Sequence, residues 1–244
     1  MKIDFAYISD RGLNPRYTVN EDSYLIMPDE HVFAVADGVG GAHAGDVASS
    51  SALGIIKKGV EQFGHRSGDN KIRFLQILIK AANNVVYQKG KRKNKQMAST
   101  LAIVLIDQNY AVIGHVGDSR IYIIRDGKLV QLTKDHSKLQ ELLDQNPQLT
   151  ITRNNYSDGH VITRALGADP IVYPDIQKVI LKHNDIFILC TDGIYSHNSD
   201  VDLLDAINQY ANMLPIACEQ FKLNCYEKGA KDNLTAIVLK ISQE

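Results

Sequence analysis

The sequence predicts an α+β fold in which antiparallel sheets lie in the middle and helices cover them outside. Two observations favour it. Two strand pairs are joined by very short turns, Gln108-Asn109 and Asp126-Gly127, and hairpins of this kind make antiparallel sheets. Amphipathic helical segments form blocks of their own and do not alternate with single strands, which is typical of layered α+β folds.

Several segments are rich in β-branched, aromatic and other apolar residues and are bounded by turn residues, as strands are. In chain order they are Ile3–Ile8, Ser23–Met27, Val32–Ala36, Leu101–Asp107, Tyr110–Val116, Ile121–Arg125, Lys128–Leu132, Ile186–Thr191 and Leu234–Ile241. The pair Asp126-Gly127 is a strong signal for a type I′ turn.

Three segments repeat apolar residues at helical spacing and so predict helices with one apolar face. The faces are Ala48-Ala52-Ile55-Gly59-Phe63, Leu75-Leu78-Ala82-Val85 and Leu203-Ile207-Tyr210-Leu214. Ser199-Asp200 is the expected N-cap of the third helix. A fourth helix is expected over Ile216–Lys228.

The polar segment Thr133–Pro174 differs from the rest of the chain. It contains one predicted short helix, Ser137–Leu143, and is longer than most connections in a compact domain. Loops of this length are commonly functional.

The bulk composition is that of an ordinary globular protein. The 244 residues contain 44% hydrophobic and 23% charged residues, and the net charge of -1 gives no field toward nucleic acid or an anionic membrane. The one dense basic run, Lys89–Gln96, lacks interleaved aromatic residues and is interpreted as a solvated loop. Charge and turn residues are spread evenly, which favours a single domain over residues 1–244.

We expect a soluble cytoplasmic protein. Cys190, Cys218 and Cys225 are far apart and odd in number, which favours reduced, packed thiols. The N-terminal residues contain no apolar core of a signal peptide, and no apolar run approaches the length of a membrane span.

Four aspartates occupy similar positions at the ends of apolar strands. Asp37 and Asp192 each follow a predicted strand and precede glycine, Asp118 follows a strand and Gly117, and Asp232 lies just before the last strand. Buried carboxylates are costly unless they are paired or metal-bound, and no matching set of lysines or arginines flanks these positions. A group of carboxylate ligands selects hard cations, Mg²⁺ or Mn²⁺.

The alternative reading of each Asp-Gly pair is a simple turn, and Asp126-Gly127 is interpreted as one. Spacing alone does not establish that the four strand ends meet. Two ions bridged by a carboxylate would generate a hydroxide nucleophile and stabilise an in-line phosphoryl transition state.

The motifs together resemble the metal-dependent protein phosphatase family, the type 2C Ser/Thr phosphatases, in its compact bacterial form. The resemblance runs nearly end to end, and its specificity lies in the order of the motifs. They are Asn20-Glu21-Asp22-Ser23, Val32–Ser49, Met97–Thr100, Val116–Arg120, Thr133–Ser137, Ile162–Gly167, Leu189–Gly193 and Asp232–Thr235.

The resemblance implies a four-layer αββα sandwich, with two central antiparallel sheets flanked by helices and a flap at about residues 133–174. It implies that Asp37 bridges two Mn²⁺ or Mg²⁺ ions, that the Gly38 carbonyl is a ligand, and that Asp192 and Asp232 complete the pair. Asp118 would share a third, weaker ion with Asp192. Glu21 and Asp22 would hold metal-bound waters.

The phosphate clamp departs from the family pattern. The family places an arginine three residues before the Asn of its Asn-Glu-Asp motif, where this chain has Tyr17. Arg16 is the predicted substrate-binding residue, because a guanidinium binds phosphate in bidentate fashion. A surface role for Arg16 stays open, and Arg11 is a less favoured stand-in.

The general acid also departs from the pattern. Many bacterial members have a histidine directly after the second glycine of the Asp-Gly-x-Gly-Gly segment, where this chain has Ala42 followed by His43. His43 is a candidate acid, and a metal-bound water or a solvent-facing histidine are the alternatives. His136 is expected to support the flap, and His160 has no assigned chemistry.

The predicted activity is hydrolysis of phosphoserine and phosphothreonine on proteins by direct attack of a metal-bridging hydroxide, with Asp37, Asp192 and Asp232 as the catalytic set. The alternatives are a phosphatase-like domain that binds phosphoproteins without hydrolysing them, and a hydrolase of small phosphoesters. The expected partners are substrates of a Ser/Thr kinase, with no nucleic acid or membrane, and the expected state is a monomer.

Overall fold

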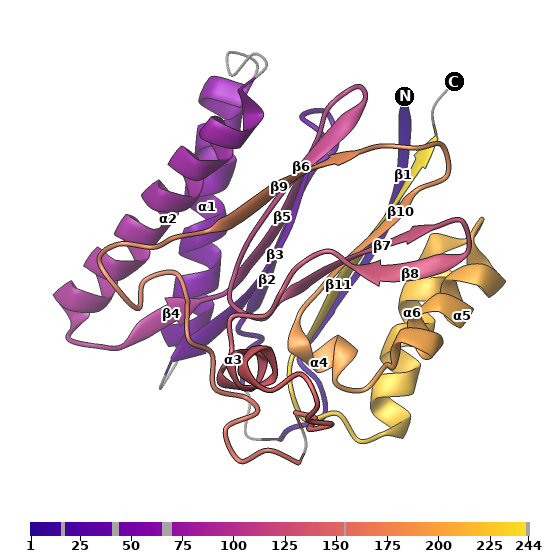
Figure 1. The fold of residues 1–244 in the computed structure, drawn as a ribbon. Helices are drawn as coiled ribbons and strands as arrows, with labels where there is room; N and C mark the ends of the chain where they lie inside the picture. The colour runs from indigo at the N-terminus through magenta and orange to yellow at the C-terminus, as the bar shows by residue number, and fades with distance from the viewer. Residues whose placement is uncertain (16–17, 41–43, 65–69, 154, 243–244) are drawn as a thin grey trace.

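The computed structural model describes residues 1–15, 18–40, 44–64, 70–153 and 155–242. Within this part of the chain, two antiparallel sheets pack face to face and helices cover both outer faces (Figure 1). The predicted αββα sandwich is therefore confirmed.

The first sheet has the strand order β1-β11-β10-β7-β8. Its strands are β1 Lys2–Asp10, β7 Arg120–Arg125, β8 Lys128–Gln131, β10 Ile186–Cys190 and β11 Leu234–Ser242. Asp126 and Gly127 join β7 to β8 with φ values of 52° and 71°, the two positive angles that a type I′ turn requires. The hairpin predicted at this turn is thus confirmed.

The second sheet has the order β2-β3-β5-β6-β9, and β4 pairs with β3 beside it. Its strands are β2 Asp22–Met27, β3 Val32–Gly40, β4 Met97–Ser99, β5 Leu101–Ile106, β6 Tyr110–Val116 and β9 Asp175–Ile180. The expected hairpin at Gln108-Asn109 is confirmed by the pairing of Ile106 with Ala111.

The longer helices lie on opposite outer faces of the sandwich. Helices α1 Ala44–Phe63 and α2 Lys71–Lys93 cover the second sheet, and α5 Asp200–Tyr210 and α6 Leu214–Glu227 cover the first (Figure 1). Ser199 caps α5 as predicted and forms a reciprocal capping box with Asp202. The short helix α3 Lys138–Gln145 begins after its cap Ser137, and α4 Asp192–Tyr195 follows β10 directly.

Three buried apolar clusters hold these layers together. One joins α1 and α2 to the second sheet, one joins α4, α5 and α6 to the first sheet, and one fills the space between the sheets. Phe33 of the second sheet and Phe187 of the first sheet are both fully buried in this central cluster. Burial of this apolar surface stabilises the layer order, because each sheet has two faces to remove from water.

Two strands were not predicted. β4 has three residues, and β9 is an edge strand in which every residue is exposed or only partly buried. β9 begins where the predicted flap ends, so residues 146–153 and 155–174 cross from α3 to this strand with turns and isolated bridges. None of the described helices is both long enough and apolar enough to cross a membrane.

Candidate active site

The site forms where strands of both sheets end at the same edge of the sandwich. Asp22 at the start of β2 pairs in register with Asp37 in β3. The backbone N–H of Asp37 donates to Thr100 Oγ1 at 2.8 Å, and Thr100 N–H donates to the Asp37 carbonyl at 2.8 Å. From the other sheet, Thr191 at the end of β10 donates its hydroxyl to Asp22 Oδ2 at 2.8 Å.

Five carboxylates influence one another at this edge. Burial raises the pKa of Asp37 well above its usual value, and Asp22, Asp192, Asp118 and Asp232 raise it further. Burial together with Asp192 and Asp232 raises the pKa of Asp22 to about 8. The structure therefore brings together the four strand-end aspartates of the sequence prediction and adds Asp22 to them.

Two of these carboxylates have buried oxygens for which the described residues provide no hydrogen-bond partner. They are Asp22 Oδ1 and Asp192 Oδ1. An unpartnered buried carboxylate oxygen is costly, and it is a suitable ligand for a hard divalent cation. The donor set at this edge therefore fits the two ions that the resemblance implies, with Asp37, Gly38, Asp192 and Asp232 as the residues that would hold them.

Gly38 lies where no side chain fits. A Cβ at this position would be 2.0 Å from the Gly45 carbonyl oxygen and 2.6 Å from the Glu21 carbonyl oxygen. The Gly38 N–H donates to that Glu21 oxygen at 3.2 Å. The Glu21 carboxylate is equally close to Gly45, where a Cβ would meet Oε2 at 2.6 Å. Glu21 is thus placed beside the Asp37-Gly38 backbone, as a residue that supports the site must be.

Asn233 connects three segments of the site, and its role was not predicted. Its Oδ1 accepts from the Glu21 N–H at 2.8 Å, and its Nδ2 donates to the Arg11 carbonyl at 2.9 Å. The Asn233 N–H donates to Asp232 Oδ1 at 2.9 Å. The available signal was a side-chain amide next to the Asp232 carboxylate, because an amide offers both a donor and an acceptor.

Asp118 is held on the other side of the site. Gly117 before it has a φ of 99°, and a Cβ there would lie 2.7 Å from Thr100 Cγ2, so glycine is required. Burial and Asp192 raise the pKa of Asp118 to about 6. Its Oδ2 accepts from Arg153 Nη1 at 2.8 Å, and its carbonyl accepts from the Tyr195 hydroxyl at 3.0 Å.

An open cleft of about 520 Å³ lies next to these carboxylates. Asp192 and Asp232 line it together with His160, Lys228 and Lys231. The cleft has room for a phosphorylated side chain. Lys231 is suited to an anionic ligand, whereas Lys228 is paired with Asp202 at 2.9 Å.

Comparison with known proteins gives the family. The model of the protein phosphatase 2C family matches residues 20–234, which is most of the chain. The chain belongs to the protein phosphatase 2C family. A curated relative, the serine/threonine phosphatase stp of Listeria monocytogenes serotype 4b (strain F2365), is 29% identical over 238 residues, which are 95% of this chain and 93% of stp.

Solved structures of protein phosphatase 2C relatives have the same fold. The serine/threonine phosphatase PstP/Ppp of Mycobacterium tuberculosis matches with a TM-score of 0.88 and 27% identity over 99% of each chain. A second structure, the catalytic domain of PstP in complex with two manganese ions, matches with a TM-score of 0.85 and 28% identity over 99% of each chain.

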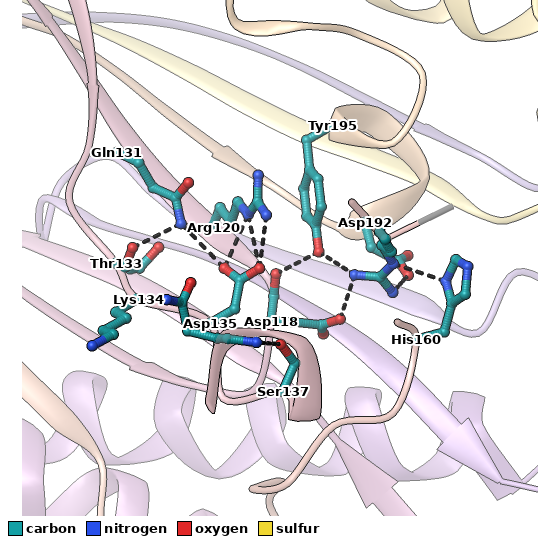
Figure 2. A network of polar contacts seen from close by, with 12 residues as sticks. Asp118, Arg120, Gln131, Thr133, Lys134, Asp135, Ser137, His160, Asp192 and Tyr195 are labelled. Carbon is teal, nitrogen blue, oxygen red and sulfur yellow. Dashed lines mark hydrogen bonds and ion pairs between the residues drawn. The ribbon is translucent and has the colours of Figure 1, made fainter. Parts of the chain in front are cut away.

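Other residues of the protein phosphatase 2C motifs lie outside the carboxylate cluster and support the elements that carry it. Arg120 forms a bidentate ion pair with Asp135, with Nε to Oδ1 at 2.9 Å and Nη2 to Oδ2 at 2.7 Å (Figure 2). Gln131 donates to the same Asp135 Oδ1 at 3.1 Å. The Arg120 guanidinium also lies 3.7 Å from the centre of the Tyr195 ring. These contacts tie the start of the flap to β7 and to α4.

His136 supports the Asp118 loop, in agreement with its expected role at the flap. Its Nδ1 accepts from the Gly117 N–H at 3.0 Å, and its backbone N–H donates to the Gly117 carbonyl at 2.9 Å. Burial, the stacked ring of His115 and Arg164 lower the pKa of His136 to about 4. His136 is therefore neutral at physiological pH.

His115, His136 and Asp175 have one ligand atom each within 4.8 Å of one another, as a metal site would require. His136 Nδ1 accepts from the Gly117 N–H at 3.0 Å, and its Nε2 lies 2.9 Å from Arg164 Nη1. The same Arg164 nitrogen donates to Asp175 Oδ1 at 2.7 Å, so a guanidinium already contacts both groups that a metal ion would need. The three residues are therefore a hydrogen-bonded support.

The two residues that depart from the protein phosphatase 2C pattern, Arg16 and His43, lie outside the described residues. The backbone near the other candidate clamp is described. A Cβ on Gly12 would meet the Asp232 carbonyl oxygen at 1.9 Å, so the segment of Arg11 and Gly12 lies directly against the end of the site.

Proposed function

We propose that this chain is a metal-dependent protein serine/threonine phosphatase. Its membership of the protein phosphatase 2C family and the names of its relatives support this activity. The observation that carries the proposal is the meeting of Asp22, Asp37, Asp118, Asp192 and Asp232, with buried carboxylate oxygens that lack partners among the described residues. Such a set is stable in its charged form only with bound cations.

We assign Asp37, the Gly38 carbonyl, Asp192 and Asp232 as ligands of two Mn²⁺ or Mg²⁺ ions. When bound, such ions lower the pKa of a water nucleophile and offset the charge of the phosphate. We assign Asp22 and Glu21 to the orientation of these metal ligands. Asn233 fixes the loop of Glu21 relative to Asp232. Arg16 is assigned to the substrate phosphate, and His43 stays the candidate for the leaving-group proton.

The substrates that we propose are phosphoproteins modified by a Ser/Thr kinase. The cleft beside Asp192 and Asp232 supports this, because it is open enough for a phosphoserine on a polypeptide and has Lys228 and Lys231 along its wall. A single catalytic domain over residues 1–244, a monomeric state, a cytoplasmic location and the absence of nucleic-acid and membrane partners remain predictions. The three buried, unpaired cysteines are consistent with a reducing compartment.

The test is turnover of a phosphoserine or phosphothreonine peptide with added Mn²⁺. We expect activity that a chelator abolishes, and we expect Asp192→Asn to lose it, because this change removes a ligand and keeps the shape of the side chain. Unchanged turnover in Asp192→Asn would contradict the site, and activity that survives the chelator would contradict the metal dependence.

The same assay separates the alternatives. A phosphoprotein-binding domain without catalysis would bind the peptide and release no phosphate. A hydrolase of small phosphoesters would turn over small metabolites in preference to peptides.

A further inference from the structure

A flap arginine lies inside the carboxylate cluster. Arg153 belongs to the segment between α3 and β9, yet its side chain is only 14% exposed. Asp118, Asp192, Tyr195 and His160, which surround it, turn toward one another in Figure 2. Arg153 thus connects the flap to the end of β6 and to the start of α4.

Every nitrogen of this guanidinium has a partner. Nη1 donates to Asp118 Oδ2 at 2.8 Å and to the Tyr195 hydroxyl at 2.6 Å, and Nη2 donates to Asp192 Oδ2. Nε donates to His160 Nδ1 at 2.8 Å. The Tyr195 hydroxyl in turn donates to the Asp118 carbonyl at 3.0 Å. This network suits a planar guanidinium. Its N–H donors point in fixed directions, and each nitrogen meets an acceptor on a neighbouring side chain.

Arg153 takes the position that a shared cation would need. A third ion held by Asp118 and Asp192 would require an oxygen from each, and both Oδ2 atoms accept hydrogen bonds from Arg153. A metal ion bound through these two Oδ2 atoms would therefore have to displace the Arg153 guanidinium. Asp192 still offers Oδ1, which is buried and lacks a partner among the described residues.

We infer that the Arg153 guanidinium replaces a third metal ion between Asp118 and Asp192, so that the centre operates with two ions and one built-in cation. Arg153 is a positioning residue: it fixes the side chain of Asp192 and docks the flap at the cleft. It neutralises charge that two ions alone would leave at this side. The inference rests on the proposed two-ion centre.

The role of His160 follows from the same contacts. Its Nδ1 accepts a hydrogen bond from Arg153 Nε at 2.8 Å, so the imidazole ring is held beside the guanidinium. His160 also lines the cleft with Asp192 and Asp232. Arg153 therefore holds one wall of the cleft as well as the two carboxylates.

The experiment is a Mn²⁺ titration of the full chain without substrate, followed by calorimetry and by electron paramagnetic resonance. We expect two ions per chain in the wild type. Arg153→Ala should bind one additional, weaker ion, because Asp118 and Asp192 become free to share it. Arg153→Lys keeps the positive charge and should return the number to two.

Lys138→Ala is the matched control. It removes another flap cation, which pairs with Asp158 at 2.9 Å on the surface, and should leave the number of ions at two. Three ions in the wild type, or the same number in the wild type and Arg153→Ala, would overturn the inference. A wild type that binds two ions but releases no phosphate from phosphopeptides would contradict the proposed function and leave the assignment of Arg153 standing.

Discussion

The two sides of the carboxylate cluster are neutralised in different ways. On one side, Asp22 accepts from the uncharged hydroxyl of Thr191, and Asp37 is fixed through the backbone by Thr100. On the other side, Asp118 and Asp192 share the charged guanidinium of Arg153. Neutral donors orient a carboxylate without removing its charge, whereas an arginine does both.

The two sides therefore have different requirements. The neutral donors of the first side do not offset its negative charge, so bound cations are needed there, and Asp192 supplies a proposed ligand to the same ions from the second side. The second side carries its own cation on the flap, so the flap position depends on the charges of Asp118 and Asp192. Four sets of variants examine the site and the residues that support it, and the largest expected effect comes first.

Asp37→Asn should remove most activity, because it takes a proposed metal ligand from the site. We expect kcat/KM on a phosphopeptide to fall on the order of 1000-fold, the size of the several kcal/mol that metal ions supply to a transition state. Asp126→Asn is the matched control, since Asp126 also precedes a glycine but lies in the β7–β8 turn. Equal losses in both variants would show that the effect is not specific to the site.

Asp135→Asn should act on stability. It breaks the bidentate pair with Arg120, whose side chain is only 24% exposed, and removal of one partner from a buried pair costs about 3 kcal/mol. Urea unfolding measures the free energy of unfolding. Asp158→Asn breaks the exposed Lys138 pair and should change the stability by less than about 1 kcal/mol. Unaltered stability in Asp135→Asn would mean that this pair does not secure the flap base.

Arg16→Ala and Arg11→Ala identify the phosphate clamp. A charged hydrogen bond to phosphate is worth about 1.5–3 kcal/mol, so loss of the true clamp should lower kcat/KM by about 10–100-fold, mainly through KM. We expect this for Arg16, with Arg11→Ala as the comparison. The reverse ranking would move the clamp to the segment that lies against Asp232.

His136 should make stability depend on pH. Its pKa falls from 6.5 to about 4 on folding, so the unfolded chain binds more protons between these two values. The contribution is complete above pH 6.5 and is lost as pH falls toward 4, by about 1.4 kcal/mol per pH unit. His136→Asn should flatten this slope relative to the wild type. Parallel slopes in both proteins would assign the acid sensitivity to other groups.

The strands and helices were predictable where side-chain periodicity determines them. Segments such as Tyr110–Val116 are buried along almost their whole length, so their composition alone marks them. β9 was not predicted, because its residues are exposed or partly buried and include Gln177 and Lys178 among the apolar ones. A strand formed mainly by backbone pairing to β6 leaves little trace in its side chains.

The carboxylates that meet at the site were predictable from the sequence, and the residues that support them were not. Asp37 and Asp192 stand out because a carboxylate interrupts an apolar run before a glycine. Arg153 lies in a segment without regular structure, and its partners Asp118 and Asp192 are 35 and 39 residues away along the chain. No local pattern in the sequence predicts such a contact. Asn233 was visible as part of a motif, but its bonds to Glu21 and Arg11 require the fold.

The pairing of β1 with β11 constrains when the enzyme can first become active. Residues 2–10 pair along their length with residues 234–242, and Asp232 lies two residues before that strand begins. During synthesis on the ribosome, β1 therefore remains unpaired with β11 while more than 220 residues are added. The proposed metal centre needs Asp232 and cannot assemble before β11 emerges, so a nascent chain should have no phosphatase activity. Until then the unpaired edge of β1 is open to pairing with other chains.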